Sequence, residues 1–206
     1  MKAFIKKYIE KDHCFDKWTL LGVFCLIIVI SGVFGFIYEY IFYFFDGGMK
    51  RFYWQGGNFL PWINIYAIGA MLVYFLTYKK RKNIWLVFLI SFFACGLLEY
   101  FSGLGIYLLC DGARYWDYNK EILNFGNIGG FICLRSVLFF DFSSLLLMYL
   151  IVPFCFYLAE KMNKRSFLIF SFLLCSVFLV DEFYNLFARA CNFTDAIEIY
   201  EKLGLR

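Results

Sequence analysis

The chain has 206 residues, of which 63% are hydrophobic and only 17% are charged, and its net charge is +4. This balance excludes an ordinary soluble domain, in which about 25% of residues are charged, and the mean hydropathy of +0.68 indicates a membrane protein. None of the eight cysteines forms a Cys-x2-Cys pair and His13 is the only histidine, so we expect neither a zinc site nor a disulfide-stapled secreted fold. No cofactor and no nucleic-acid partner is predicted.

Five stretches are long and apolar enough to approach the roughly 20 residues that a membrane-spanning helix needs. In chain order they are residues 18–45, 61–78, 84–109, 128–157 and 167–187. They predict an all-α, polytopic bundle of five transmembrane helices. The domain plan is then an N-terminal segment (1–17), a five-span membrane domain (18–187) and a C-terminal tail (188–206).

The basic residues predict how this bundle is oriented. With five crossings, twelve Lys and Arg residues fall on the side of the N-terminus, and seven fall on the other side, where acidic residues balance them. Because positive charge accumulates on the cytoplasmic side, the N-terminus is predicted to be cytoplasmic and the C-terminus external. A different number of crossings would scatter the lysines over both sides.

The first and third stretches carry the same polar pattern. Ser31-x3-Gly35-x3-Glu39-Tyr40 in one corresponds to Ser91-x3-Cys95-x3-Glu99-Tyr100 in the other. Each pattern is followed by Asp-Gly, an arginine, a tryptophan and an asparagine that opens the next span. Both halves run in the same direction, so the first four helices are predicted to be a parallel duplication of a helical hairpin. The alternative is chance similarity within an apolar sequence.

The charges within the spans reach similar depths. At about 1.5 Å per residue, Glu39, Glu99, Arg135 and Glu182 lie ~9, ~15, ~12 and ~8 Å from the outer ends of their spans. Charges in a membrane usually face a protein interior or a water-filled cavity, so Arg135 is expected to meet Glu99 or Glu39. Asp141 is expected to lie deeper, ~21 Å down, and alone.

Two interpretations of this cluster stay open: a structural ion pair, or a substrate site open to the outside. The loop residues Trp116-Asp117-Tyr118 belong to an aromatic stretch that the aspartate interrupts, which suggests that Asp117 caps a turn or that the loop gates the site. The predicted polar site comprises Glu39, Glu99, Arg135, Glu182, Trp116, Asp117, Tyr118 and Asn127.

Several motifs in this region resemble those of a known family. Gly96-Leu97-Leu98-Glu99-Tyr100, then Trp116-Asp117-Tyr118, then Asn127-x2-Gly130-x2-Cys133-Leu134 are similar to the second half of the CmpB-like family, small bacterial membrane proteins named as ABC-transporter permeases. The resemblance covers roughly residues 25–145. Asn119 stands where that family has a serine, and the Gly-Pro element of its first half is degraded here around Pro61. The resemblance implies a transport component of the bacterial cytoplasmic membrane.

Three functions are compatible with these residues. The first is a transport component, either permease-like or a substrate-capturing subunit, which needs a separate ATPase because the chain has no P-loop and its inner connections are short. The second is a membrane enzyme whose paired carboxylates act on a lipid or a small polar substrate; no Ser-His pair or metal cluster supports it. The third is a structural or regulatory partner of another membrane protein.

Overall fold

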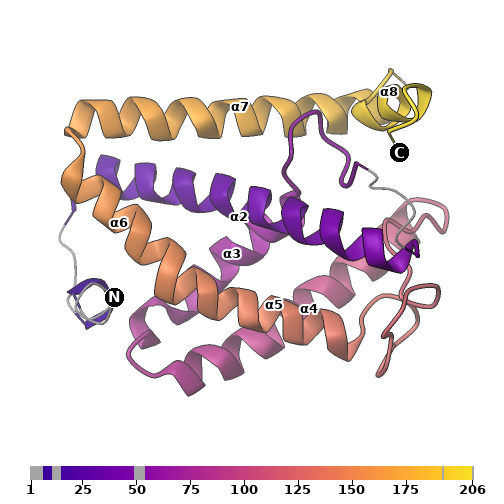
Figure 1. The fold of residues 1–206 in the computed structure, drawn as a ribbon, viewed down its shortest axis with the longest axis horizontal. Coiled ribbons are helices and arrows are strands. Elements are labelled where there is room, and N and C mark those ends of the chain that lie inside the picture. Colours follow the sequence, from indigo (N-terminus) through magenta and orange to yellow (C-terminus); the bar gives the residue numbers. More distant parts are fainter. Residues whose placement is uncertain (1–6, 11–14, 49–53, 192, 206) are drawn as a thin grey trace. The chain divides into compact units, whose positions relative to one another are not determined.

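The computed structural model describes residues 7–10, 15–48, 54–191 and 193–205 (Figure 1). Within these residues all regular elements are helices, so the predicted all-α class is confirmed for the part of the chain that is described. The elements are α2 (Lys17–Asp46), α3 (Asn64–Thr77), η1 (Tyr78–Lys80), α4 (Ile84–Leu109), α5 (Leu134–Leu146), η2 (Leu147–Ile151), α6 (Val152–Lys161), α7 (Lys164–Ala190) and α8 (Ala196–Lys202).

Four helices among the described residues are long and apolar enough to cross a membrane. They are Lys17–Asp46, Ile84–Leu109, the continuous helix Leu134–Lys161, and Lys164–Ala188 within α7. These agree closely with four of the five predicted stretches. The fifth, predicted at 61–78, is α3, whose 14 residues extend only about 21 Å where a bilayer core measures roughly 30 Å. The chain is therefore a multi-pass membrane protein, and four helices in its described ranges are long enough to span a bilayer.

The long helix Leu134–Lys161 contains a π-helical turn, η2, between α5 and α6. Pro153 lies at the start of α6, and a proline has no N–H to donate to the preceding turn. A local π turn is a usual way for a helix to accommodate such an interruption. The helix therefore continues as one element through the proline.

The described residues form two compact units. One comprises those within 1–10 and 72–150, and is called the α4–α5 unit; the other comprises those within 11–71 and 151–206, and is called the α2–α7 unit.

In the α2–α7 unit, α2 packs along α7 and also contacts α6. Gly22 of α2 lies against Phe167, and Gly32, further along α2, lies against Phe178. The capping residue of α2, Asp16, pairs with Lys164 at the start of α7, 3.1 Å apart. The two helices therefore run in the same direction (Figure 1). Residues of α2 and α7 meet α3 and the residue Trp62 before it in one buried core cluster, made of Cys25, Val29, Trp62, Ala67, Cys175 and Phe178.

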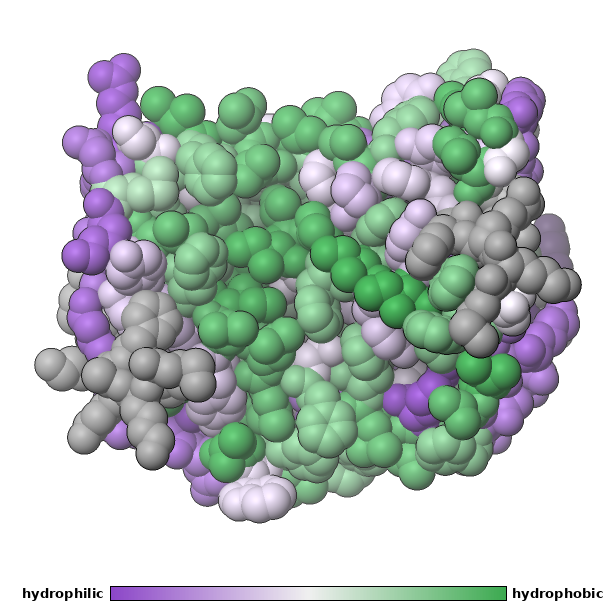
Figure 2. Space-filling view, viewed as in Figure 1, coloured by the Kyte–Doolittle hydropathy of each residue, from purple (hydrophilic) through white to green (hydrophobic). Residues whose placement is uncertain are grey.

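The outward face of α7 is apolar. Leu173, Val180, Phe183 and Leu186 each expose more than 60% of their surface. Figure 2 shows hydrophobic residues along the middle of this helix and hydrophilic residues at the end where it begins. Such a face in water would be unfavourable, so it is a surface for contact with lipid.

In the α4–α5 unit, α4 and α5 pack against each other in opposite directions. Glu99 of α4 contacts Ser136 near the start of α5, and Cys95, one turn earlier on α4, contacts Ser144 two turns further along α5. The predicted small-residue face of α4 is buried here: Ser91, Cys95 and Glu99 are 0%, 4% and 3% exposed. As expected from its spacing, Glu99 thus faces the protein interior.

Candidate functional site

The carboxylate of Glu99 is enclosed by hydroxyl groups from two other parts of the α4–α5 unit. The Tyr118 hydroxyl, from the loop between α4 and α5, donates a hydrogen bond to Oε1. Ser136 Oγ, in the first turn of α5, donates to Oε2 at 2.7 Å. A carboxylate buried in a membrane helix needs such donors, and Glu99, Tyr118 and Ser136 are together called the Glu99 cluster.

The position of Ser136 follows from the local sequence of α5. Ser136 Oγ also accepts the N–H of Cys133, 3.3 Å away, as in a capping box at the helix start. The start of α5 therefore fixes the position of the Ser136 side chain independently of its hydrogen bond to Glu99.

Tyr118 is held in place by the backbone of its own loop. Its N–H donates to the Gly130 carbonyl at 3.1 Å, and the neighbouring Trp116 donates through Nε1 to the Phe131 carbonyl at 3.0 Å. Burial, together with the adjacent Glu99 carboxylate, raises the pKa of the Tyr118 phenol well above its ordinary value. The phenol thus keeps its proton and remains a donor to Glu99.

Asp117, Asn119 and Asn127 shape the loop without contacting Glu99. Asp117 Oδ1 accepts the Asn119 side-chain amide at 2.7 Å, and Asn119 Oδ1 in turn accepts the Asn127 amide at 2.8 Å. Asn127 Oδ1 accepts the N–H of Gly130 at 2.8 Å. Partial burial acts to raise the pKa of the Asp117 carboxyl, but the Asn119 hydrogen bonds and the nearby Arg114 outweigh it, so this pKa lies below its ordinary value.

Gly130 is required at the centre of this loop. Its φ of +81° is one that residues with a side chain rarely adopt. A Cβ atom there would also overlap the side chains of Asn119, Arg114 and Asp117.

Arg135 forms its ion pair with a loop residue that the sequence did not single out as a partner. Its Nη2 lies 2.7 Å from Oε2 of Glu121, and both side chains are largely buried. The guanidinium also lies over the Tyr118 ring, 5.2 Å from its centroid. The pair with Glu121 places the positive charge beside the Glu99 cluster. The predicted contact of Arg135 with Glu99 or Glu39 stays a prediction.

In the α2–α7 unit, a second set of polar side chains surrounds the non-helical residues before α3. Asp181 of α7 accepts the N–H groups of Phe59 and Leu60, at 3.0 and 2.9 Å. Glu182 accepts the side-chain amides of Asn58 and Asn64, at 2.6 and 3.1 Å. Backbone groups that are not in a helix must find partners inside a membrane protein, so these carboxylates satisfy the segment that leads into α3.

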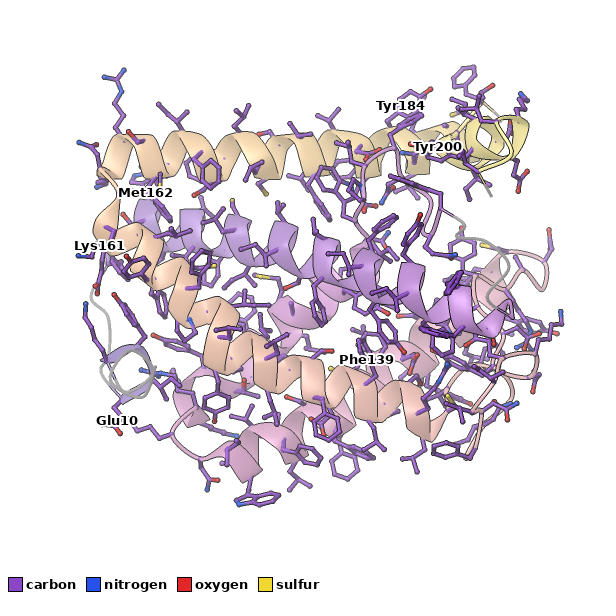
Figure 3. The ribbon with its side chains drawn as sticks, in the orientation of Figure 1. Glu10, Phe139, Lys161, Met162, Tyr184 and Tyr200 are labelled. Carbon is purple, nitrogen blue, oxygen red and sulfur yellow. The ribbon has the colours of Figure 1, made fainter. Side chains whose placement is uncertain are left out.

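Helix α8 (Ala196–Lys202) is hydrogen-bonded to the same segment before α3. Tyr200 of α8 donates its hydroxyl to the Phe59 carbonyl at 2.7 Å, and the labels in Figure 3 place Tyr184 and Tyr200 at this end of α7. Asn185 bridges Asp181 and the start of α8: its amide donates to Asp181 Oδ1 and its oxygen accepts the Ala196 N–H, each at 2.8 Å.

The predicted site residues thus fall into two groups. Glu99, Tyr118 and Arg135 lie together in the α4–α5 unit, with Trp116, Asp117 and Asn127 building the loop around them. Glu182 and the half-buried Glu39 belong to the α2–α7 unit. The predicted meeting of all four charges at one site stays a prediction.

Sequence reasoning missed Ser136, Glu121 and Asp181 as partners. The sequence offers one signal for Ser136. It lies three residues after Cys133, the residue that precedes α5, and this is the capping-box position. Glu121 and Asp181 act across sequence separations of 14 and 122 residues, so their roles depend on the folded chain. No group of three or more metal-ligating side chains lies together in the described ranges.

Comparison with known families gives a match over most of the chain. The family described as "Putative ABC-transporter type IV" matches residues 26–186. The chain belongs to this family. Searches of curated proteins and of solved structures gave no match.

The structure explains the motifs through which the chain resembles the ABC-transporter type IV family. In Asn127-x2-Gly130 the asparagine side chain bonds the glycine N–H, and in Trp116-Asp117-Tyr118 the two aromatic residues fix the loop and reach Glu99. Asn119, where the motif usually has serine, joins Asp117 to Asn127. The motifs therefore specify a loop that closes over a buried glutamate.

Proposed function

We propose that this protein is the membrane component of a transport system and captures a polar substrate at the Glu99 cluster. The observation that carries the proposal is the hydrogen bond from the Tyr118 hydroxyl to a buried carboxylate in a membrane-spanning helix. A polar substrate that donates hydrogen bonds replaces Tyr118 on Glu99 when the loop opens. Membership of the ABC-transporter type IV family supports a role in transport.

The proposed bundle has five crossings. α2 and α7 run in the same direction, because Asp16 meets Lys164 and Gly32 meets Phe178. The chain between them must then cross the membrane an odd number of times. Ile84–Leu109 and Leu134–Lys161 account for two crossings, so residues 54–77 are inferred to make the third.

This third crossing combines a non-helical segment with the short helix α3. The N–H of Ile63 donates to the carbonyl of Gly32, near the middle of α2, at 3.0 Å. α3 therefore begins at about the mid-depth of α2, and residues 54–63 occupy the remaining depth while Asp181 and Glu182 satisfy their polar groups. Interrupted helices of this kind are common in transporters, where irregular backbone is buried in protein.

The proposed orientation places the Glu99 cluster in the outer half of a bacterial cytoplasmic membrane. With five crossings, twelve of the basic residues fall on the side of the N-terminus, so the N-terminus is proposed to be cytoplasmic and the C-terminus external. The loop that carries Tyr118 then faces the outside, where a substrate would arrive.

A separate ATPase is the proposed partner. On the cytoplasmic side, two residues separate α6 from α7 and three separate η1 from α4. These connections are too short for the helix with which a self-sufficient ABC permease engages its ATPase. The chain therefore fits a substrate-capturing subunit better than a complete permease.

The proposal is tested by capturing a tagged copy of the protein from its native membranes. Wild type, Glu99→Gln and the control Glu198→Gln, the same substitution at an exposed position of α8, are compared by mass spectrometry and ATP hydrolysis. All three should retain an ATPase subunit. The Glu99→Gln complex should hydrolyse ATP several-fold more slowly, because substrate capture drives the cycle.

Two outcomes would contradict the proposal. If wild type brings down no ATPase, the protein is not a component of such a transporter. If Glu99→Gln alone loses the ATPase, Glu99 supports assembly and is not a substrate-binding residue.

A further inference from the structure

Asp141 lies on a fully buried face of α5 that the proposed substrate site does not use. It shares this face with Val137, Ser144 and Met148, at spacings of four, three and four residues. All four residues are buried, and Asp141 has no exposed surface. Counted from Ser136, Asp141 lies ~7.5 Å deeper along the helix than the Glu99 cluster.

Neither carboxylate oxygen of Asp141 has a hydrogen-bond partner among the described residues. On α4, which packs against α5, Ser91 Oγ is likewise fully buried and has no partner in that part of the chain. A buried carboxylate without a donor or a counter-charge is strongly unfavourable when ionised. The interface between α4 and α5 is called the α4–α5 seam. The described side chains of this seam do not neutralise the Asp141 carboxylate, so another species must do so.

The titratable groups around Asp141 do not supply a positive charge. On α4, Cys95 interacts electrostatically with both Asp141 and Glu99; the remaining titratable groups of α4 are Tyr100 and Tyr107. On its own helix, Arg135 lies six residues away and pairs with Glu121.

On the other side of Asp141, Tyr149 lies in the π turn η2 and donates its hydroxyl to the Arg81 carbonyl at 2.7 Å. The side chain of Arg81 is in turn held at its own helix end, where Nη1 bonds the Tyr78 carbonyl at 2.8 Å. The charged groups above and below Asp141 are thus engaged with other residues.

A metal ion fits this place poorly. Hard cations require six or more oxygen ligands arranged around the ion. Among the described residues, no oxygen or nitrogen atom is in hydrogen-bonding position to the Asp141 carboxylate. Ser144 Oγ is already bonded to the Phe140 carbonyl at 2.8 Å. A proton needs no such cage, because it neutralises the carboxylate by itself.

We propose that Asp141 is an intramembrane proton-binding site, which holds its proton while the α4–α5 seam is closed and releases it when water enters the seam. Ser144, Cys95 and Glu99 form a polar line on the seam, with Cys95 Sγ 3.8 Å from Ser144 Oγ. This line connects Asp141 to the loop that carries Tyr118. The proton site is separate from the proposed substrate site. Binding or release of a proton at Asp141 would change the charge inside the α4–α5 seam.

The proposal is tested by infrared spectroscopy of the purified protein in lipid nanodiscs at neutral pH. Wild type with 13C-labelled aspartate should show the carbonyl band of a buried, protonated carboxylic acid, shifted by the label and slow to exchange in heavy water. The band should be lost in Asp141→Asn and kept in Asp111→Asn, an exposed aspartate just after α4. A hydrophobic carbodiimide, which modifies protonated carboxyls in apolar surroundings, should label wild type at Asp141.

If Asp141→Asn does not fold, carbodiimide labelling of wild type decides the proposal. Absence of the label at Asp141 would overturn it. No aspartate band at neutral pH, or a band that persists in Asp141→Asn, would overturn it. So would a rise in unfolding temperature with sodium or calcium chloride that wild type shows and Asp141→Asn does not, because the occupant would then be a metal cation. Failure of ATPase capture, by contrast, leaves this result unaffected.

Discussion

Glu99 shows how a single charged residue is accommodated within a membrane helix. Each of its carboxylate oxygens accepts a hydrogen bond from a hydroxyl group in a different part of the α4–α5 unit. One donor is Tyr118 of the loop and the other is Ser136 of α5. The spacing of Ser91, Cys95 and Glu99 was enough to predict that the glutamate faces inward. Its partners, 19 and 37 residues away, were not predictable from spacing.

At the same scale, the buried pair of Arg135 and Glu121 should contribute measurably to stability. Removing one partner of a buried pair leaves the other charge in unfavourable surroundings and costs roughly 3–5 kcal/mol when burial is complete. We expect Arg135→Ala and Glu121→Gln each to lower the unfolding temperature in detergent. The double mutant should be less destabilised than the sum of the two.

The control for this cycle is the exposed pair Lys202–Glu198, 3.9 Å apart with more than half of each side chain accessible. Such pairs typically contribute 0.2–1 kcal/mol, so Lys202→Ala should change the unfolding temperature little. Equal effects of Arg135→Ala and Lys202→Ala would show that the Arg135 pair is not effectively buried.

At the scale of elements, the structure departs most from expectation at the predicted second span. The apolar stretch 61–78 predicts one helix, but the helix begins only at Asn64, and Asp181 accepts hydrogen bonds from the backbone of residues that precede it. Hydropathy cannot reveal this, because it records how apolar a stretch is and not whether its backbone is helical. The stabilising carboxylate is 121 residues away from Leu60.

The contact of α3 with α2 depends on a glycine. A Cβ atom added at Gly35 would overlap the Tyr66 ring, whereas one added at Gly105 of α4 would meet nothing within 4 Å. Gly35→Ala should therefore destabilise the protein by about 1–3 kcal/mol, as overpacking does. Gly105→Ala, the same substitution in a helix, should be neutral or stabilising by up to about 1 kcal/mol.

Thermal unfolding of the two variants in the same detergent makes this comparison. If Gly35→Ala unfolds at or above the temperature of Gly105→Ala, α2 and α3 do not pack at Gly35 as described.

At the scale of the whole molecule, the five-crossing topology is tested by cysteine labelling in intact bacterial cells. The background replaces the exposed Cys110 and Cys191, and Cys14, which lies outside the described residues. A membrane-impermeant maleimide should label cysteines placed at Lys120 and Lys202. Cysteines at Lys17, Lys82 and Lys161 should react only after the membrane is permeabilised.

The pattern separates five crossings from four. If residues 54–77 did not cross, Lys82 and Lys161 would lie on the opposite side from Lys17. Labelling of these two positions in intact cells, with Lys17 protected, would therefore refute the proposed crossing by α3 and the segment before it.

The amino-acid sequence is enough to predict a multi-pass helical membrane protein, the positions of the four long helices found in the described ranges, and the family. These properties follow from local quantities: the apolar length of a segment, the face on which small residues repeat, and short motifs in one loop. Three sets of contacts depend instead on the folded chain. Arg135 pairs with Glu121, Tyr118 and Ser136 bond Glu99, and Asp181 and Glu182 support the segment that leads into α3. The reason is physical: a charge in an apolar medium is stabilised by whichever donor the fold brings within hydrogen-bonding distance, and that donor can come from any part of the chain.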